Sequence, residues 1–256
     1  MTHRIVEMKP ESRTRWFRGV SAPGARIRLV CFPHAGGAAG TFHDWGALTP
    51  PEIEVMSVQY PGRQDRLSEP CATTMEELAG AVTTALLHEL PDELPLALFG
   101  HSMGSAVAYE VARRLEEVPG RALTRLIVSA RARPRTPQEL TPRPAPADSE
   151  ILDHVRKLDP DGAAAYEHPD LRPLIMPSLR ADFGLLAAYR PTPLHRLGVP
   201  VTVCGGDRDP ACAVEELSSW SDVTTEGLDV RVFEGGHFYL NRRKEELVGF
   251  VASRLS

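Results

Sequence analysis

Short apolar runs recur along the chain, and apolar residues at helical spacing fill several of the stretches between them. The runs span residues 27–32, 53–58, 96–99, 123–130, 199–205 and 228–234. Most of them are apolar at consecutive positions, which is typical of strands that helices cover on both faces of a parallel sheet. We therefore predict an α/β domain with a mostly parallel central sheet, flanking helices and right-handed crossovers.

Helices are expected after three of these runs. Thr74 and Glu77 have the spacing of a capping box. The stripe that follows them has helical spacing and consists of Met75, Leu78, Ala79, Val82 and Leu86. A second helix is predicted over residues 103–117 and a last one over about 243–254.

The stretch from about 134 to 193 departs from this alternation because no run in it indicates a strand. It begins with the proline-rich sequence "RPRTPQELTPRPAPA" and continues with helical patterns at 148–158 and 177–189. Helices inserted between two core strands are typical of a lid over the carboxyl edge of a sheet. An ordinary connection with extra helices is the alternative. We predict one domain over residues 1–256, with a lid insertion at about 134–193.

Composition and charge narrow the class of protein. The 256 residues are 42% hydrophobic and 25% charged, with a net charge of -5, which fits a globular protein and disfavours a nucleic-acid partner. The N-terminal region has no apolar stretch of signal-peptide length, and no run is long enough to span a membrane. We therefore expect a cytoplasmic protein that does not bind membranes.

The cysteines do not indicate a metal site. Cys31, Cys71, Cys204 and Cys212 form no C-x-x-C pair and have no histidine at zinc-finger spacing. Cys31 and Cys204 lie inside predicted strands, so buried reduced thiols are expected.

The sequence "GHSMG" at 100–104 places Ser102 between a predicted strand and a predicted helix. This context fits the nucleophile elbow of α/β-hydrolases, in which the serine hydroxyl projects above the sheet edge. Gly100 and Gly104 would avoid side-chain clashes in such a sharp turn. Ser102 is therefore the predicted nucleophile.

A serine hydroxyl needs a general base, and the chain has nine histidines from which to choose. His237 follows the last predicted strand after two glycines, which allow the chain to turn back towards the sheet edge. His101 is adjacent to Ser102, but neighbouring side chains diverge in an elbow. We predict that His237 is the base.

Two aspartates compete for the role of the acid that orients this base. Asp207 and Asp209 both follow the predicted strand at 199–205. Spacing from Gly206 and the rigid turn expected at Pro210 favour Asp209, whereas Asp207 is expected to accept backbone hydrogen bonds in the turn. The resulting chain order of serine, aspartate and histidine agrees with an α/β-hydrolase.

Charge that develops on a substrate carbonyl needs hydrogen-bond donors already in place. The backbone N–H of Met103 lies at the start of a predicted helix, whose dipole adds to its effect. The loop "CFPHAGGAAGTF" after the first predicted strand offers a second donor, for which we select Ala35. A glycine-rich turn without catalytic duty is the alternative for this loop.

The chain resembles the type II thioesterases that accompany polyketide and nonribosomal peptide synthases. The resemblance rests on "FPHAGG", "YPGRQDRLSEP", "FGHSMGSAVAYE", "LRADF", "GGDRDP" and "GGHFYL", and it extends from about residue 15 to 253. It implies an α/β-hydrolase fold with a helical lid, no cofactor, and a substrate acyl group on the phosphopantetheine arm of an acyl or peptidyl carrier protein. It also implies roles for Ser102, Asp209 and His237 as triad and for Ala35 and Met103 as oxyanion donors. A monomer is the expected state.

Other functions could use the same residues. An esterase or lipase, an acyltransferase, or a thioesterase that releases medium-chain acyl groups from carrier proteins would also use Ser102. A non-catalytic module that binds acyl carriers is a further alternative. Arginines at the base of the predicted lid would meet an acidic carrier or the phosphate of its arm, or form a solvated loop; they are Arg131, Arg133, Arg135 and Arg143.

Overall fold

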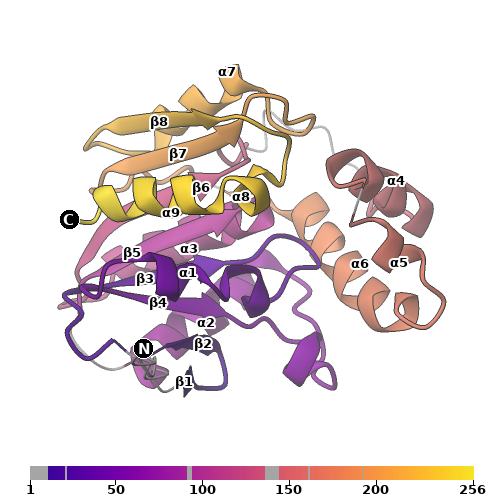
Figure 1. The fold of residues 1–256 in the computed structure, drawn as a ribbon, viewed down its shortest axis with the longest axis horizontal. Helices are drawn as coiled ribbons and strands as arrows, with labels where there is room; N and C mark the ends of the chain where they lie inside the picture. The colour runs from indigo at the N-terminus through magenta and orange to yellow at the C-terminus, as the bar shows by residue number, and fades with distance from the viewer. Residues whose placement is uncertain (1–10, 21, 91–93, 136–143, 161, 192) are drawn as a thin grey trace, which may run out of the picture.

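The computed structural model describes residues 11–20, 22–90, 94–135, 144–160, 162–191 and 193–256. It contains an eight-stranded sheet in the order β1-β2-β4-β3-β5-β6-β7-β8 (Figure 1). The strands are β1 (Glu11–Arg13), β2 (Phe17–Val20), β3 (Ile27–Phe32), β4 (Ile53–Val58), β5 (Leu96–His101), β6 (Leu123–Ser129), β7 (Val201–Gly206) and β8 (Leu228–Phe233). Strands β3 to β8 are mutually parallel, whereas β1 and β2 add to the β4 edge in antiparallel orientation.

The strands predicted from apolar runs are confirmed as β3 to β8. The two antiparallel strands were not predicted. Strand β2 has only four residues, of which Phe17 alone is fully buried. A short strand near the edge of the sheet, between β1 and β4, lacks the consecutive apolar positions that mark the other strands.

Alternate residues of the interior strands point to opposite faces of the sheet. In β3, Val30 and Phe32 pack in the same apolar cluster as α2 (Met75–Glu89) and α3 (Met103–Glu116). Leu29 and Cys31 pack in the cluster on the other face, with α1 (Trp45–Leu48) and α9 (Lys244–Ser253). Figure 1 shows α9 in front of the sheet and α2 and α3 behind it. Burial on both faces explains why these strands are apolar throughout.

The predicted cap of α2 is present with one difference. The Thr74 hydroxyl accepts a hydrogen bond from the backbone N–H of Glu77 at 3.1 Å, as expected. The Glu77 carboxylate instead accepts from the N–H of Thr73, at 2.8 Å. The hydrogen bond made by the Glu77 side chain is therefore shifted one residue towards the N-terminus, from Thr74 to Thr73.

The described residues between β6 and β7 form α4 (Asp148–Leu158), α5 (Ala164–Glu167) and α6 (Arg172–Ala188). These helices have a small apolar cluster of their own, and Figure 1 shows them set to one side of the sheet. The backbone N–H of Gly36, in the loop after β3, donates to the carboxylate of Asp182, which places α6 at the carboxyl edge of the strands. This is the position of the predicted lid, whose residues 136–143 lie outside the described part of the chain.

The remaining helices are short. They are η1 (Ala39–Phe42), η2 (Gln64–Arg66), α7 (Val214–Leu217), η4 (Ser218–Val223) and α8 (Tyr239–Arg242). All four cysteines are free thiols, and Cys31 and Cys204 are buried in their strands as predicted. Within the described ranges no helix has the length and apolarity needed to cross a membrane.

Gly104 offers a test of how closely α3 must approach the sheet. A Cβ atom at Gly104 would lie 2.0 Å from the carbonyl oxygen of Phe32, whereas one at Gly80 in α2 would meet nothing. We expect Gly104→Ala to lower the free energy of unfolding by about 2–3 kcal/mol, because the backbone of α3 or of Phe32 must move to make room for the added methyl group. Gly80→Ala, the matched control, should raise it by about 0.5–1 kcal/mol. Urea unfolding of both variants measures this, and equal effects would contradict the close approach.

Candidate active site

Ser102 occupies the sharp turn between β5 and α3. Its φ of 54° and ψ of -115° lie in a region that residues with side chains rarely adopt, and such strain persists only where the surroundings impose it. The backbone N–H of Ser102 donates to the carbonyl of Ser129 at the end of β6, at 2.8 Å. A Cβ atom at Gly100 would lie 2.2 Å from the Gly104 carbonyl oxygen, so the predicted need for small residues in this turn is confirmed.

His237 and Asp209 lie in hydrogen-bond contact. The distance between His237 Nδ1 and Asp209 Oδ2 is 2.8 Å, and both side chains are buried. The second oxygen of Asp209 accepts from the N–H of Ala211, also at 2.8 Å. When Nδ1–H donates to the carboxylate, Nε2 is left as the basic nitrogen of the ring.

Asp207 has a different role from Asp209. Its Oδ1 accepts from the backbone N–H of Gly235 at 2.7 Å. The partner is a backbone N–H as predicted, but it lies in the loop after β8 and not in the turn of Asp207 itself. This bond ties the loop after β7 to the loop after β8. The structure thus pairs His237 with Asp209.

The two loops come together because β7 and β8 are parallel neighbours whose carboxyl ends meet at one edge. Gly206, at the end of β7, allows close contact, since a Cβ there would lie 2.4 Å from the carbonyl oxygen of Gly235. Residues 28 positions apart are therefore brought together by backbone packing as well as by their own hydrogen bond.

A cavity of about 1010 Å³ opens at this edge, and Ser102, Ala35 and His237 all line it. Its volume is within the usual range of small-molecule sites. Apolar residues of two lid helices also line it: Val155 and Leu158 of α4, and Phe183 and Leu186 of α6. Others are packed in the core or exposed on the surface: Met176, Leu179 and Leu185 are buried, and Leu171 and Leu174 are exposed.

The backbone N–H groups of Ala35 and Met103 donate no hydrogen bond to any described residue. Met103 is the first residue of α3, where a helix leaves N–H groups without intrahelical partners. Ala35 lies in the loop that follows β3, beside the cavity. Both predicted oxyanion donors are therefore free to bind a ligand atom.

Two further histidines surround His237. The ring of His101 lies 5.2 Å from that of His237, centre to centre, and its Nδ1 lies 2.8 Å from the hydroxyl of Ser129. Burial, followed by the nearby His237, lowers the pKa of His101 well below its usual value. Burial likewise lowers the pKa of His34 to about 3. Neither ring adds positive charge beside His237 near neutral pH.

A buried ion pair joins the lid to the segment after β4, and both of its members also hydrogen-bond to the loop that carries Ala35. Arg63 donates to Asp182 of α6 at 2.6 and 2.9 Å, and both side chains are buried. Asp182 also accepts from the N–H of Gly36 at 2.8 Å, and Arg63 donates to the carbonyl of Gly37 at 3.1 Å. The motifs "YPGRQDRLSEP" and "LRADF" contain Arg63 and Asp182, but no local pattern in the sequence indicates that they pair.

Comparison with known proteins identifies the family of this chain. Residues 27–255 match a family model described as a thioesterase domain. The chain belongs to the thioesterase domain family. The resemblance seen in the sequence motifs and the predicted α/β-hydrolase fold are thereby confirmed.

Relatives of this family member include a curated protein and solved structures. Thioesterase PikA5 of Streptomyces venezuelae is 38% identical over 235 residues, which cover 91% of this chain and 83% of PikA5. The type II thioesterase BorB from the borrelidin biosynthetic cluster has a TM-score of 0.80 at 34% identity, covering 94% of this chain and 98% of BorB. RedJ, from the prodiginine pathway of Streptomyces coelicolor, has a TM-score of 0.81 at 33% identity, covering 91% and 87%.

The neutral, buried His101 gives this thioesterase a predictable response to acid. Its folded pKa lies below the unfolded value of about 6.5, so the stability it contributes is present above that pH and is lost as the pH falls. We expect His101→Asn to flatten the dependence of unfolding free energy on pH below 6, by up to about 1.4 kcal/mol per pH unit. Urea unfolding at several pH values measures both slopes. A slope unchanged by the substitution would contradict this expectation.

Asp182→Asn tests the ion pair that joins the lid to the segment after β4. It leaves Arg63 buried without a counter-charge, so the free energy of unfolding should fall by about 3 kcal/mol. Loss of the anchor at Gly36 should also slow thioester hydrolysis about tenfold, measured where the variant is folded. Asp148→Asn is the control, because it breaks an exposed pair with Arg180 in the same lid and should change neither quantity. If the two substitutions changed the free energy of unfolding and the rate by similar amounts, the buried pair would not anchor the lid.

Proposed function

We propose that this chain is a single-domain, monomeric serine thioesterase that removes acyl groups from the phosphopantetheine arm of acyl or peptidyl carrier proteins. Its role would be the editing of carrier-bound acyl units during polyketide or nonribosomal peptide synthesis. The observation that carries the proposal is the buried hydrogen bond between Asp209 and His237, at the edge of a cavity that Ser102 also lines.

The first half of the reaction transfers the acyl group to the enzyme. Nε2 of His237 takes the hydroxyl proton of Ser102 as Oγ attacks the thioester carbon. The oxyanion that forms accepts hydrogen bonds from the N–H groups of Met103 and Ala35. The C–S bond then breaks, and the pantetheine sulfur leaves as a thiol with the proton that His237 held.

The second half releases the acid. Water enters the cavity, gives a proton to His237 and attacks the carbonyl carbon of the acyl-serine. Collapse of this second intermediate returns the proton to Oγ of Ser102 and frees a carboxylic acid. In both halves the buried carboxylate of Asp209 stabilises the positively charged imidazole ring.

The family and the cavity together support a carrier-bound substrate. PikA5 and BorB are named as thioesterases, and BorB comes from a biosynthetic cluster. The cavity is bounded by the sheet edge and the lid, and its volume exceeds what a short acyl group alone would fill. A simple esterase would use the same catalytic residues, so the experiment must compare the two substrate classes.

Mass spectrometry of acyl-loaded carrier proteins, before and after incubation with enzyme, tests this proposal. We expect the native protein to release acyl groups from carriers faster than it cleaves matched p-nitrophenyl esters. Ser102→Ala and His237→Ala should each lower the rate by about 10³-fold or more, because triad members act as a unit. Both variants should have the same melting temperature as the native protein. Undiminished release by Ser102→Ala, or a clear preference for oxygen esters, would refute the proposal.

A further inference from the structure

Arg131 lines the active-site cavity, and its side chain has no hydrogen-bond or carboxylate partner within the part of the chain that the structure describes. It follows β6 by two residues and lines the same cavity as Ser102 and His237. Its backbone is held, because its carbonyl accepts from the Trp220 indole at 2.7 Å. Its side chain donates no hydrogen bond to any described residue, and its Nε is shut off from solvent.

The acidic residues that line this cavity already have partners. Glu216 accepts from Arg135 at 3.4 Å and from the N–H of Ala213 at 3.0 Å. The carboxylate of Glu150 accepts from the N–H of Ala147 before α4 at 2.8 Å, and that of Asp159 accepts from the N–H of Gly162 at 3.0 Å. None of these bonds involves Arg131.

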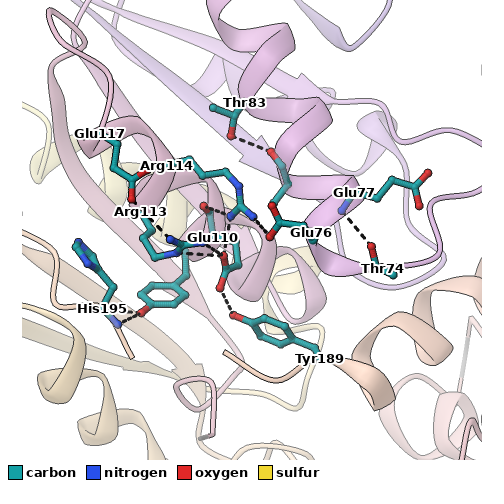
Figure 2. A network of polar contacts seen from close by, with 12 residues as sticks. Thr74, Glu76, Glu77, Thr83, Glu110, Arg113, Arg114, Glu117, Tyr189 and His195 are labelled. Atoms are coloured by element: carbon teal, nitrogen blue, oxygen red, sulfur yellow. Dashed lines mark hydrogen bonds and ion pairs between the residues drawn. The ribbon is translucent and has the colours of Figure 1, made fainter. Parts of the chain in front are cut away.

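Glu110 lies just behind the cavity wall, and it is also occupied. Figure 2 shows Tyr189, which lines the cavity, donating its hydroxyl to Glu110, at 2.8 Å. The other oxygen of Glu110 accepts from Arg113 at 3.1 Å and from Arg114 at 2.6 Å. The charge of Glu110 is thus shared among these groups.

The neighbouring arginines differ from Arg131 in this respect. Arg133 is paired with Asp222 at 2.8 Å, and Arg135 with Glu216. Arg143, the fourth arginine that the sequence marked, lies outside the described residues. Among the described members of that group, Arg131 alone has no carboxylate partner.

The Nε of Arg131 is shut off from solvent and has no hydrogen-bond partner among the described residues, although the residue as a whole is only partly buried. A donor left unpaired in this way costs free energy. A guanidinium cannot lose its proton at physiological pH, so the cost is not relieved by neutralisation. A ligand that brings a carboxylate would relieve it with two parallel hydrogen bonds. We propose that Arg131 binds a carboxylate on the acyl group of the substrate, so that acyl groups with a terminal acid are hydrolysed preferentially.

This inference rests on the proposed thioesterase function, and the position of Arg131 selects the source of the anion. Strand β6 lies beside β5, with Ser129 opposite His101, so Arg131 begins one strand away from the nucleophile. The carboxylate of a short dicarboxylic acyl group lies a few bonds from the thioester carbonyl. The phosphate of the carrier arm lies at the far end of the whole pantetheine chain. The geometry therefore points to the acyl carboxylate.

Hydrolysis of two matched N-acetylcysteamine thioesters tests the assignment, since these substrates carry no phosphate. The acidic member is the glutaryl thioester and the neutral one is the pentanoyl thioester. Arg131→Gln should lower kcat/KM for the glutaryl substrate about 30-fold, as expected for a lost charge-assisted pair, and change it less than twofold for the pentanoyl substrate. Arg135→Gln, the control on the same cavity wall, should change neither.

A binding measurement keeps the test independent of turnover. Ser102→Ala protein should bind the non-hydrolysable glutaryl amide analogue at least tenfold more tightly than the Ser102→Ala, Arg131→Gln double variant does. If the native protein cleaves no thioester, the proposed function fails, and this comparison still decides the role of Arg131. Arg131→Met serves as a second variant, because an apolar side chain removes the unpaired charge without adding a polar group.

Two results would overturn the inference. Equal losses for the glutaryl and pentanoyl substrates would make Arg131 a structural residue. Losses with both acyl groups on phosphopantetheine carriers, but with neither on N-acetylcysteamine, would assign Arg131 to the phosphate of the arm.

Discussion

The buried hydrogen bond between Asp209 and His237 is the interaction on which the rest of the site depends. It forms because two parallel strands, β7 and β8, end side by side and two glycine contacts let their loops touch. Beneath it, His101, Ser129 and Tyr239 form a chain of hydrogen bonds of 2.8 and 2.7 Å. His237 is therefore held by its hydrogen bond to Asp209 and lies beside the ring of His101, which this chain of hydrogen bonds holds in place.

The lid is part of this arrangement rather than a separate cover. Helix α6 is tied to the loop after β3 through Asp182 and Arg63, and the residue after its end, Tyr189, is tied to α3 through Glu110 (Figure 2). The first of these ties lies next to the free N–H of Ala35. A movement of α6 would consequently alter the donor positions as well as access to the cavity.

The sequence was most informative where chemistry or burial restricts local choice. Strands covered on both faces need consecutive apolar residues, and an exposed, strained serine needs glycines at fixed offsets, so β3 to β8 and the turn at Ser102 were predictable. The short strand β2 was not, because half-exposed residues carry no such pattern. Asp207 and Asp209 could be ranked from turn chemistry, but their different partners depend on loop packing.

Contacts between distant segments were beyond the reach of sequence patterns. Arg63 and Asp182 are 119 residues apart, and nothing local to either marks the other as its partner. The lack of a described carboxylate partner for Arg131 is harder still to foresee, because it depends on each described acid that lines the cavity having another donor. Both observations follow from tertiary packing, which depends on the whole sequence and not on any local pattern within it.

The rate at which a fluorophosphonate labels Ser102 tests the central hydrogen bond most directly. At neutral pH the native protein and Asp207→Asn should be labelled at Ser102 at similar rates. Asp209→Asn should react at least about 10²-fold more slowly, because His237 loses the tautomer that accepts the hydroxyl proton. Slow labelling of Asp207→Asn together with native-like labelling of Asp209→Asn would contradict this account of the site.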